Sequence, residues 1–568
     1  MKYKLLAIDL DGTLLKRHRK ITKNNFKALK AFNDAGGQII ISTGRAITSA
    51  RRVANRIENY IGAKIPYIIS LCGSVIYDDK NKIVSEKLIN PEITKKIADE
   101  VKRLGLNIWI YPKEIEKEGV YSKSLALTVF AKTAKNINLK KIDFDKTSMF
   151  ARKSDVFGLN PNKIEKFETH LKNKLSKYVT IHKTNNVFME ISPVGGSKGD
   201  SIKIIADKLN IPLNEVAAIG DSGNDLSAAI VSKCFGAIGN NKLLKNYSSE
   251  EYSRLNSPVA KFINNRLLSG PTKVKLIGSD LDGTVLNGEK IIGSDFNKKI
   301  KPFIKNNTPS LAFVSGRSVS EIHRIIKNNN LTSVPIRYAI SNNGAIIYDL
   351  YKQKTIYTQP ILKRTAYEIV KFFEEACKNK KYGDIACFFY THNDKEVKKS
   401  INSSQKFLVK AYAFKENKNK FNNLSLFDNF NVIYVDRLPK NLSITKFLIF
   451  FKSTECRDMF MNDLEKMNLN VIITTSSQTN IEINAWYVSK GNTLKRLAKM
   501  LKIKNSELMT LGDQTNDISM LKLTDWSFTF DYSPISVKNA AKYVIKQDGK
   551  ENAIIKALKI YNKERNND

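Results

Sequence analysis

One nine-residue pattern, an apolar run that ends in two aspartates and is followed by Gly-Thr, occurs twice in this chain of 568 residues. The copies are residues 5–13, with Asp9 and Asp11, and residues 276–284, with Asp280 and Asp282. An uninterrupted apolar run is typical of a parallel strand that is buried on both faces. Carboxylates that directly follow such a strand lie at the edge of an open α/β sheet where ligands bind. The sequence therefore predicts two α/β domains, each with an acidic site.

Three further short patterns also occur twice, in the same order. They are Thr43-Gly44-Arg45 and Ser315-Gly316-Arg317, then Ser197-Lys198-Gly199 and Ser489-Lys490-Gly491, then Gly-Asp-x-x-Asn-Asp ending at Asp225 and at Asp517. The copies stay in register except between the Arg and Lys patterns, where the second copy is 20 residues longer. Because a catalytic core must keep its spacing, we expect an inserted segment to hold this difference.

The length and the local composition predict two tandem halves. The chain is too long for one core, and a Gly-Pro pair interrupts it near residue 270. We predict a first core in residues 1–85 and 185–268, a first cap in 86–184, a linker in 269–272, a second core in 273–358 and 478–568, and a second cap in 359–477.

Within each predicted core, apolar strands alternate with amphipathic helices. Residues 38–42 and 65–71 are typical of strands, and residues 46–61 between them are typical of a helix. This alternation predicts a Rossmann-like, doubly wound parallel sheet. The inserted segments predict a smaller strand–helix–strand domain: strands at 154–159 and 178–182 around a helix at 161–175, and strands at 447–451 and 470–474 around a helix at 454–467.

The repeated residues are suited to phosphoryl chemistry. A carboxylate at a strand end can attack phosphorus, and a second carboxylate two residues later can donate and accept a proton. We therefore predict Asp9, Asp11, Asp280 and Asp282 as catalytic residues. Each pattern alone is typical of an ordinary turn or helix start. Ordinary turns and helix starts do not explain four patterns that occur in one order and then occur again in the same order.

A phosphate dianion needs a cation to approach paired carboxylates, and Mg²⁺ prefers such oxygen ligands. The candidate metal ligands are Asp9, Asp11, Asp221, Asp225, Asp280, Asp282, Asp513 and Asp517. The candidate phosphate-binding residues are Thr43, Arg45, Lys198, Asn224, Ser315, Arg317, Lys490 and Asn516.

Together these motifs resemble those of the haloacid-dehalogenase-like (HAD) superfamily, in its Cof-type branch of sugar-phosphate phosphatases. The resemblance covers essentially the whole chain as two consecutive copies. It implies a Mg²⁺-dependent phosphatase that acts on small phosphorylated metabolites through an aspartyl-phosphate intermediate. In that family the first Asp is the nucleophile, the second is the acid and base, and the inserted cap determines the substrate.

The first copy departs from the family pattern more than the second. The family's Asn-Gly-Ala is present as Asn343-Gly344-Ala345, whereas the first copy has Cys72-Gly73-Ser74. The family's Met after the metal motif is present in the second copy as Met520, whereas the first copy has Ala228. The family's closing Asp-Gly is found only in the second copy, as Asp548-Gly549. Both copies retain every residue that carries the chemistry. One alternative is nevertheless that one half, more readily the first, is a regulatory or binding module.

Composition narrows the other classes of function. No run reaches the ~18 apolar residues of a membrane span, and we expect no signal peptide, because residues 1–4 lead directly into the first apolar run. The five cysteines are scattered, so we expect a reducing cytoplasm. The net charge of +39 is compatible with nucleic-acid binding, but the basic residues are spread along the chain and no nucleic-acid-binding motif accompanies them. The sequence does not decide whether the phosphoryl group is transferred to water or to a sugar, and it does not identify the substrate. No protein partner is predicted.

Overall fold

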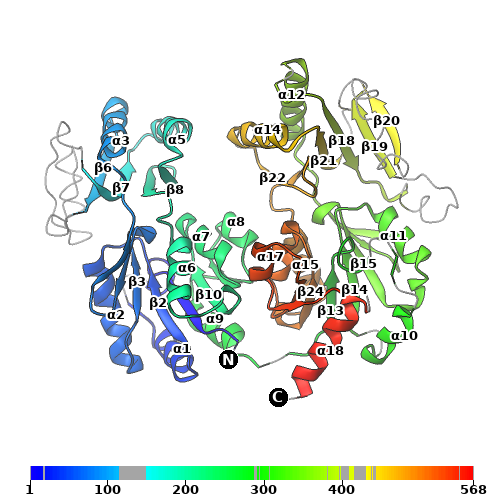
Figure 1. Cartoon of the computed structure of the whole chain (residues 1–568), viewed down its shortest axis with the longest axis horizontal. Helices are drawn as coiled ribbons and strands as arrows, with labels where there is room; N and C mark the ends of the chain where they lie inside the picture. Colours follow the sequence, from blue (N-terminus) through cyan, green and yellow to red (C-terminus); the bar gives the residue numbers. More distant parts are fainter. Residues whose placement is uncertain are drawn as a thin grey trace. The chain divides into compact units, whose positions relative to one another are not determined.

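The computed structural model divides into two compact units, Met1–Gly270 and Pro271–Asp568 (Figure 1). The structure describes residues 2–16, 20–113, 149–270, 272–286, 291–292, 295–305, 308–379, 381–395, 397, 409–414, 430–435, 438, 443–467, 469–548 and 551–566. Part of each predicted cap, Pro271 of the predicted linker, Gly549 and a few further residues of both predicted cores lie outside these residues.

In the described part of the first unit, an eight-stranded sheet has the order β12-β11-β10-β1-β2-β3-β4-β5. Neighbours from β12 to β3 are parallel, and β4 and β5 continue the sheet antiparallel. The strands are β1 (Leu5–Ile8), β2 (Gln38–Ser42), β3 (Tyr67–Ser70), β4 (Val75–Asp78), β5 (Ile83–Glu86), β10 (Val216–Gly220), β11 (Cys234–Ile238) and β12 (Glu250–Tyr252). The helices are α1 (Lys23–Asp34), α2 (Ile47–Ile61), α6 (Lys198–Lys208), α7 (Leu226–Val231), α8 (Lys242–Asn246) and α9 (Pro258–Phe262).

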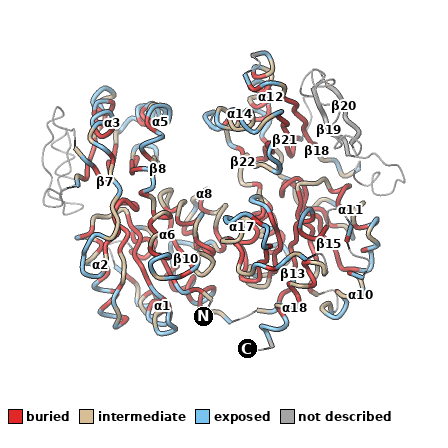
Figure 2. Tube along the Cα trace, in the orientation of Figure 1, coloured by how far each residue is buried: buried red, intermediate tan, exposed pale blue. Residues whose placement is uncertain are grey.

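Helices cover both faces of this sheet, so its central strands are buried throughout (Figure 2). Leu6 and Ile8 of β1 pack in one cluster with α1, α2 and α9. Leu5 and Ala7, which point the other way, pack in a second cluster with α6, α7 and α8. An apolar residue at every position of β1 is therefore what a strand between two helical layers requires.

A second, smaller sheet in this unit, which we call the first cap sheet, has the described order β6-β7-β9-β8 and is antiparallel. Its elements are α3 (Pro91–Leu104), β6 (Asn107–Pro112), β7 (Ala151–Phe157), α5 (Pro161–Leu175), β8 (Val179–Asn185) and β9 (Phe188–Pro193). Ile108, Val156 and Met189 face α3 and α5 in one apolar cluster. The alternate residues of β6, β7 and β9 share the opposite face, and several of them carry charge.

The second unit repeats this plan. Its described core sheet has the order β17-β16-β15-β14-β13-β24-β25-β26. The strands are β13 (Leu276–Ser279), β14 (Ser310–Val314), β15 (Ile336–Ser341), β16 (Ile346–Asp349), β17 (Lys354–Thr358), β24 (Leu508–Leu511), β25 (Trp526–Phe530) and β26 (Tyr543–Ile545). The helices are α10 (Phe296–Ile300), α11 (Val319–Asn328), α15 (Lys490–Met500), α16 (Ile518–Leu521), α17 (Ile535–Ala540) and α18 (Ala553–Asn566).

The second cap sheet has the described order β20-β19-β18-β21-β23-β22. Its elements are α12 (Lys363–Asn379), β18 (Ile385–Thr391), β19 (Val409–Phe414), β20 (Phe430–Val435), β21 (Ile444–Phe451), α14 (Thr454–Lys466), β22 (Val471–Thr474) and β23 (Asn480–Ala485). The expected strands at 447–451 and 470–474 correspond to β21 and β22, whereas β18, β19, β20 and β23 were not expected. Strand β23 belongs to the cap sheet, although residues from 478 onward were predicted to belong to the second core.

The predicted fold class is confirmed, since both units hold a mostly parallel sheet between helices and a separate smaller sheet. The strand expected at 38–42 is β2, and the helix expected at 161–175 is α5. The helix expected at 46–61 begins one residue later, because Ala46 is its N-cap in an extended conformation. Among the described residues, no helix has the length and apolarity to cross a bilayer.

We expect each unit to fold by itself, because each has buried clusters on both faces of its own core sheet. Fragments 1–270 and 271–568 should each give a soluble protein with a cooperative thermal transition, measured by circular dichroism and calorimetry. A fragment that stays unfolded in isolation would contradict this expectation.

Candidate active site

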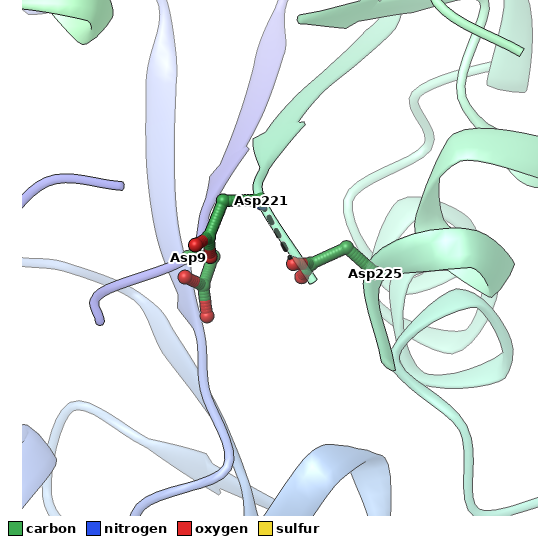
Figure 3. A group of neighbouring side chains, drawn as sticks. All are labelled: Asp9, Asp221 and Asp225. Atoms are coloured by element: carbon green, nitrogen blue, oxygen red, sulfur yellow. Dashed lines mark hydrogen bonds between the residues drawn. The ribbon is translucent and has the colours of Figure 1, made fainter. Parts of the chain in front are cut away.

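The acidic residues of the first unit meet because two neighbouring parallel strands end side by side. Strand β1 ends at Ile8 and β10 ends at Gly220, so Asp9 and Asp221 are the next residues of each. The amide of Asp9 also donates to the carbonyl oxygen of Ile219, at 3.1 Å, which extends the pairing by one residue. Figure 3 shows Asp9 and Asp221 next to each other, with Asp225 to the right of both.

Gly12 allows the loop after β1 to pass directly over Asp221. Its backbone has φ +80°, and a Cβ built there would lie 2.2 Å from Asp221 Oδ2. Thr13 Oγ1 donates to Asp221 Oδ1 at 3.4 Å. Gly12 is thus required both by the left-handed conformation and by the close approach of a carboxylate.

A fully buried lysine connects the carboxylates. Lys198, the first residue of α6, donates from Nζ to Asp9 Oδ1 at 2.8 Å and to Asp225 Oδ1 at 2.6 Å. The other oxygen of Asp225 accepts from the backbone amides of Asp221 and Ser222, at 3.0 Å each. Asp225 therefore holds both the lysine and the loop that carries Asp221.

Burial dominates the electrostatics of this cluster. It raises the pKa of Asp9 well above its ordinary value, with Asp225 and Asp221 acting in the same direction and Lys198 opposing them. Burial and Asp225 also raise the pKa of Asp221, to about 6. The pKa of Lys198 is raised because its two carboxylate partners outweigh the effect of burial. Crowded carboxylates of this kind are stabilised as anions by a nearby cation.

These residues fit a divalent metal ion. One carboxylate oxygen each from Asp9, Asp221 and Asp225 lies within 4.8 Å of the others. Asp280, Asp513 and Asp517 form the matching group in the second unit. Buried carboxylate oxygens with an excess of negative charge are the ligands that hard cations such as Mg²⁺ or Mn²⁺ prefer.

Asp11 does not join this group. Its carboxylate accepts from Arg45 Nε and Nη2, at 2.6 and 2.5 Å, and its side chain is 62% exposed. The bidentate pair raises the pKa of Arg45. In the second unit Arg317 binds Asp282 in the same way, at 2.7 and 2.6 Å. Both aspartates thus face the solvent side of the site, so their predicted role as metal ligands stays a prediction.

The remaining predicted residues border the same site. Thr43 and Ser315 are buried, and their hydroxyl oxygens accept from the amides of Arg45 and Arg317, at 3.2 Å each. Asn224 instead points toward the cap sheet, where its Nδ2 donates to Glu190 Oε2 at 2.8 Å.

The second unit reproduces the central contacts. Lys490, buried at the start of α15, donates to Asp280 Oδ1 at 2.6 Å and to Asp517 Oδ1 at 2.7 Å. Asp517 accepts from the amides of Asp513 and Gln514, at 3.0 Å each. Burial raises the pKa of Asp280, with Lys490 opposing and Asp517 adding to it. The two sites therefore share one arrangement of four charged groups.

The cap sheets add a buried ion pair that the sequence patterns did not single out. In the first cap Lys153 pairs with Glu190, and with Asp155 at 3.0 Å. In the second cap Lys446 pairs with Glu482 at 3.1 Å. Burial alone would raise the pKa of Glu190, but Lys153 outweighs it and lowers the pKa to about 2.

Strand register shows that the two pairs are equivalent. Lys153 lies opposite Tyr111, and Asp155 opposite Glu190; Lys446 lies opposite Tyr390, and Leu448 opposite Glu482. The same lysine and glutamate thus recur, whereas Asp155 is replaced by Leu448. The sequence did contain a signal for these glutamates, because Glu190-Ile191 and Glu482-Ile483 stand at the same distance before the repeated lysine of the core.

Each glutamate binds a core amide, but from a different loop. Glu190 accepts from Asn224, next to the metal motif, whereas Glu482 accepts from Asn343 Nδ2 at 2.6 Å. Cys72 stands where the second unit has Asn343, and both have a left-handed backbone, with φ of 62° and 59°. The first unit has Cys72-Gly73-Ser74 in place of Asn-Gly-Ala and so lacks the amide that donates to the cap glutamate in the second unit. Asn224 donates to Glu190 instead.

The cavities over the two sites differ in size. The first has a volume of about 1300 Å³ and the second about 300 Å³. Asn240, two residues after β11, lines the first cavity. Tyr532 occupies the same position after β25, and its hydroxyl donates to the carbonyl oxygen of Gly283. A tyrosine bound to the acidic loop thus stands in the second unit where the first has an asparagine that lines the cavity.

A model of the haloacid dehalogenase-like hydrolase family matches the chain twice, over residues 6–245 and 277–558. Two curated relatives from Bacillus subtilis are each named as a 5-amino-6-(5-phospho-D-ribitylamino)uracil phosphatase. YcsE is 26% identical over 237 residues, 42% of this chain and 84% of that protein. YwtE is 29% identical over 259 residues, 39% of this chain and 83% of that protein.

Solved structures of similar proteins each match about half of the chain. A haloacid dehalogenase-like hydrolase from Bacteroides thetaiotaomicron is 21% identical, with a TM-score of 0.40, over 46% of this chain and 99% of that one.

We predict that Gly12→Ala disrupts the first acidic cluster, because the new Cβ would collide with Asp221. In a Mn²⁺ titration followed by electron paramagnetic resonance, the variant should bind one ion where the unaltered chain binds two. Gly62→Ala is the matched control, since Gly62 has φ +77° and no heavy atom within 4 Å of a Cβ. It should lose about 1 kcal/mol of stability from backbone strain and still bind two ions. Two ions bound by Gly12→Ala would contradict the predicted role of Gly12.

Proposed function

The chain belongs to the haloacid dehalogenase-like hydrolase family, and from this we propose that it is a Mg²⁺-dependent phosphatase with two active sites. Each site would hydrolyse a small phosphate monoester through an aspartyl-phosphate intermediate. The observation that carries the proposal is the buried lysine that contacts two aspartates in each unit. Lys198 and Lys490 make these contacts within 2.6–2.8 Å, so neither site has lost a charged member.

The proposed chemistry begins at the strand end. A carboxylate oxygen of Asp9 would attack phosphorus, and the bond from phosphorus to the leaving alcohol oxygen would break. Asp11 would donate a proton to that oxygen and later accept one from the water that hydrolyses the aspartyl phosphate. Arg45 holds Asp11 at the open side of the site, where both the alcohol and the water can reach it. Asp280, Asp282 and Arg317 would act in the same way in the second unit.

Lys198 and Thr43 would bind the phosphoryl oxygens. Lys198 also opposes the effect of burial on the pKa of Asp9, since a positive charge beside a carboxylate favours its anionic form. Asp9, Asp221 and Asp225 would hold Mg²⁺, which neutralises charge on the phosphoryl group and orients it when bound. Asn224 stays a proposed phosphate ligand that would first have to leave Glu190.

The substrate class that we propose is small phosphorylated metabolites. The curated relatives YcsE and YwtE are named for the phosphate ester of a ribitylamino-uracil, which has hydroxyl groups and a ring in its leaving group. The larger first cavity accommodates a leaving group of this size, and the second favours a smaller one. Cytoplasmic location and the absence of a nucleic-acid or protein partner stay predictions.

An alternative is that the first unit binds a phosphorylated ligand without hydrolysing it. Its departure at Cys72 and the loss of the corresponding amide are the observations in its favour. Single-site variants separate the two proposals.

We predict that Asp9→Asn and Asp280→Asn each silence one site. With p-nitrophenyl phosphate and Mg²⁺, each single variant should keep the activity of its intact unit. The double variant should lose about 10³-fold or more, because no nucleophile is left. Chelation by EDTA should silence all active forms.

Two results of this series would change the proposal. Complete loss in Asp280→Asn alone would mean that the first unit is not an enzyme. Activity that survives EDTA would mean that the metal assignment is wrong.

We further propose that the buried cap pairs contact the leaving group. Lys153 and Glu190 line the first cavity, and Lys446 and Glu482 line the second. A buried ion pair contributes little to stability compared with well-packed apolar residues, so its presence at both sites favours a role in binding. Binding energy from the leaving group can then position the phosphate for attack.

We predict that Glu190→Gln, made in the Asp280→Asn chain, lowers kcat/KM about tenfold for a hydroxylated sugar phosphate and hardly affects p-nitrophenyl phosphate. The reason is that the substitution removes a charged hydrogen-bond acceptor for the hydroxyl groups of the sugar. The nitrophenyl group has no hydroxyl group that would need this acceptor. Glu100→Gln is the control, because Glu100 is a buried cap carboxylate that pairs with Arg103 on α3. Equal losses on both substrates would show that Glu190 acts through the fold and not through the leaving group.

A further inference from the structure

The proposed metal ligand Asp221 has an arginine partner that its counterpart lacks. Arg254 Nη2 lies 2.7 Å from Asp221 Oδ2. In the described part of the second unit, the donors to the Asp513 carboxylate are both neutral: Thr284 Oγ1 at 3.1 Å and Gln514 Nε2 at 3.0 Å. The two acidic clusters therefore differ by one positive charge in direct contact with a ligand.

Strand pairing identifies the residue that corresponds to Arg254. Strand β12 pairs with β11 through Tyr252 and Ile238, and β26 pairs with β25 through Ile545 and Phe530. Two residues after these positions stand Arg254 in the first unit and Gln547 in the second. The difference is thus a substitution at one structural position.

In the first unit each carboxylate of the acidic cluster is paired with a lysine or arginine side chain. Lys198 contacts Asp9 and Asp225, and Arg254 contacts Asp221. A divalent ion that bound there would compete with the guanidinium for Asp221 Oδ2. In the second unit Lys490 contacts Asp280 and Asp517, and the described partners of Asp513 can yield to a cation without breaking an ion pair.

We propose that Arg254 acts as an internal competitor of the metal ion, so the first site binds a divalent cation more weakly than the second. The inference rests on the proposed function, since it takes both clusters to be metal sites. The Arg254 side chain is 63% exposed, so it can swing into solvent when displaced, and the pair makes a modest contribution. We expect a difference in Kd of about threefold to tenfold.

One consequence is that the two sites would respond to different metal concentrations. When the divalent ion is scarce, the second site would be filled first, and only its substrate would be hydrolysed. The first site, with the larger cavity, would become active at higher concentrations of the ion.

The test is a Mn²⁺ titration of the full chain by calorimetry and electron paramagnetic resonance, which needs no turnover. Asp513→Asn isolates the first site and Asp221→Asn the second. We expect the first site to have the higher Kd, and Arg254→Gln in the Asp513→Asn chain to lower it about threefold to tenfold. Lys245→Gln is the matched control, because Lys245 lines the same cavity but pairs with Glu251, at 3.2 Å. It should leave the Kd unchanged.

The outcomes separate this inference from the proposed function. Equal Kd values at the two sites, a weaker second site, or no change in Arg254→Gln would overturn the role of Arg254 and leave the phosphatase proposal standing. No binding of Mn²⁺ to the unaltered chain would overturn the metal-dependent function itself. An equal change in Lys245→Gln would show that general charge in the cavity, and not the contact with Asp221, sets the affinity.

Discussion

The site in each unit depends on a buried lysine that neutralises two buried aspartates. Lys198 is inaccessible to solvent, and Asp9 and Asp225 are nearly so. Removing one partner would leave an uncompensated charge in the interior, which is far more costly than losing the pair as a whole. The lysine also joins distant parts of the chain, since Asp9 follows β1, Asp225 follows β10, and Lys198 begins α6. The strand ends, the loops and the helix start are therefore held in one arrangement by charge.

Around this shared centre the two units have changed in ways that can be traced residue by residue. The cap glutamate keeps an amide partner in both, but takes it from Asn224 in one unit and Asn343 in the other. Leu448 replaces Asp155 beside the cap lysine, which removes one of its two carboxylate partners. The contacts of Lys198 with Asp9 and Asp225 recur in the second unit, where Lys490 contacts Asp280 and Asp517. The two units thus keep the same charged centre while residues around it differ.

Both polar and apolar contacts join the caps to the cores, and in the first unit Ala46 and Leu71 of the core pack with Trp109 and Tyr111 of the cap. In the second unit Lys446 Nζ donates to the carbonyl oxygen of Gly316 at 2.9 Å, and Asn484 Nδ2 donates to that of Asn342 at 3.0 Å. Such contacts can exchange with water or with substrate hydroxyls at small net cost, because a hydrogen bond is replaced by another of similar strength.

The sequence by itself determined the fold class and the central residues of both sites. Buried strands that end in Asp9 and Asp280 have an unmistakable pattern, because a strand covered on both faces must be apolar at every position. The repeated order of the motifs also singled out Lys198, which begins α6, and Asp221, which follows β10. Local chemistry and spacing were sufficient there, since each motif lies at the end of a strand or the start of a helix.

Only the tertiary structure decided what surrounds these residues. The pairing of Arg45 with Asp11, of Lys153 with Glu190, and of Arg254 with Asp221 joins residues 34, 37 and 33 positions apart. No periodicity relates such partners, because their contact depends on how strands from different segments align. Charged residues on a cap strand or a surface loop also have no distinctive local pattern. The sequence therefore identified the reactive groups, whereas their partners could be identified only from the assembled sheets.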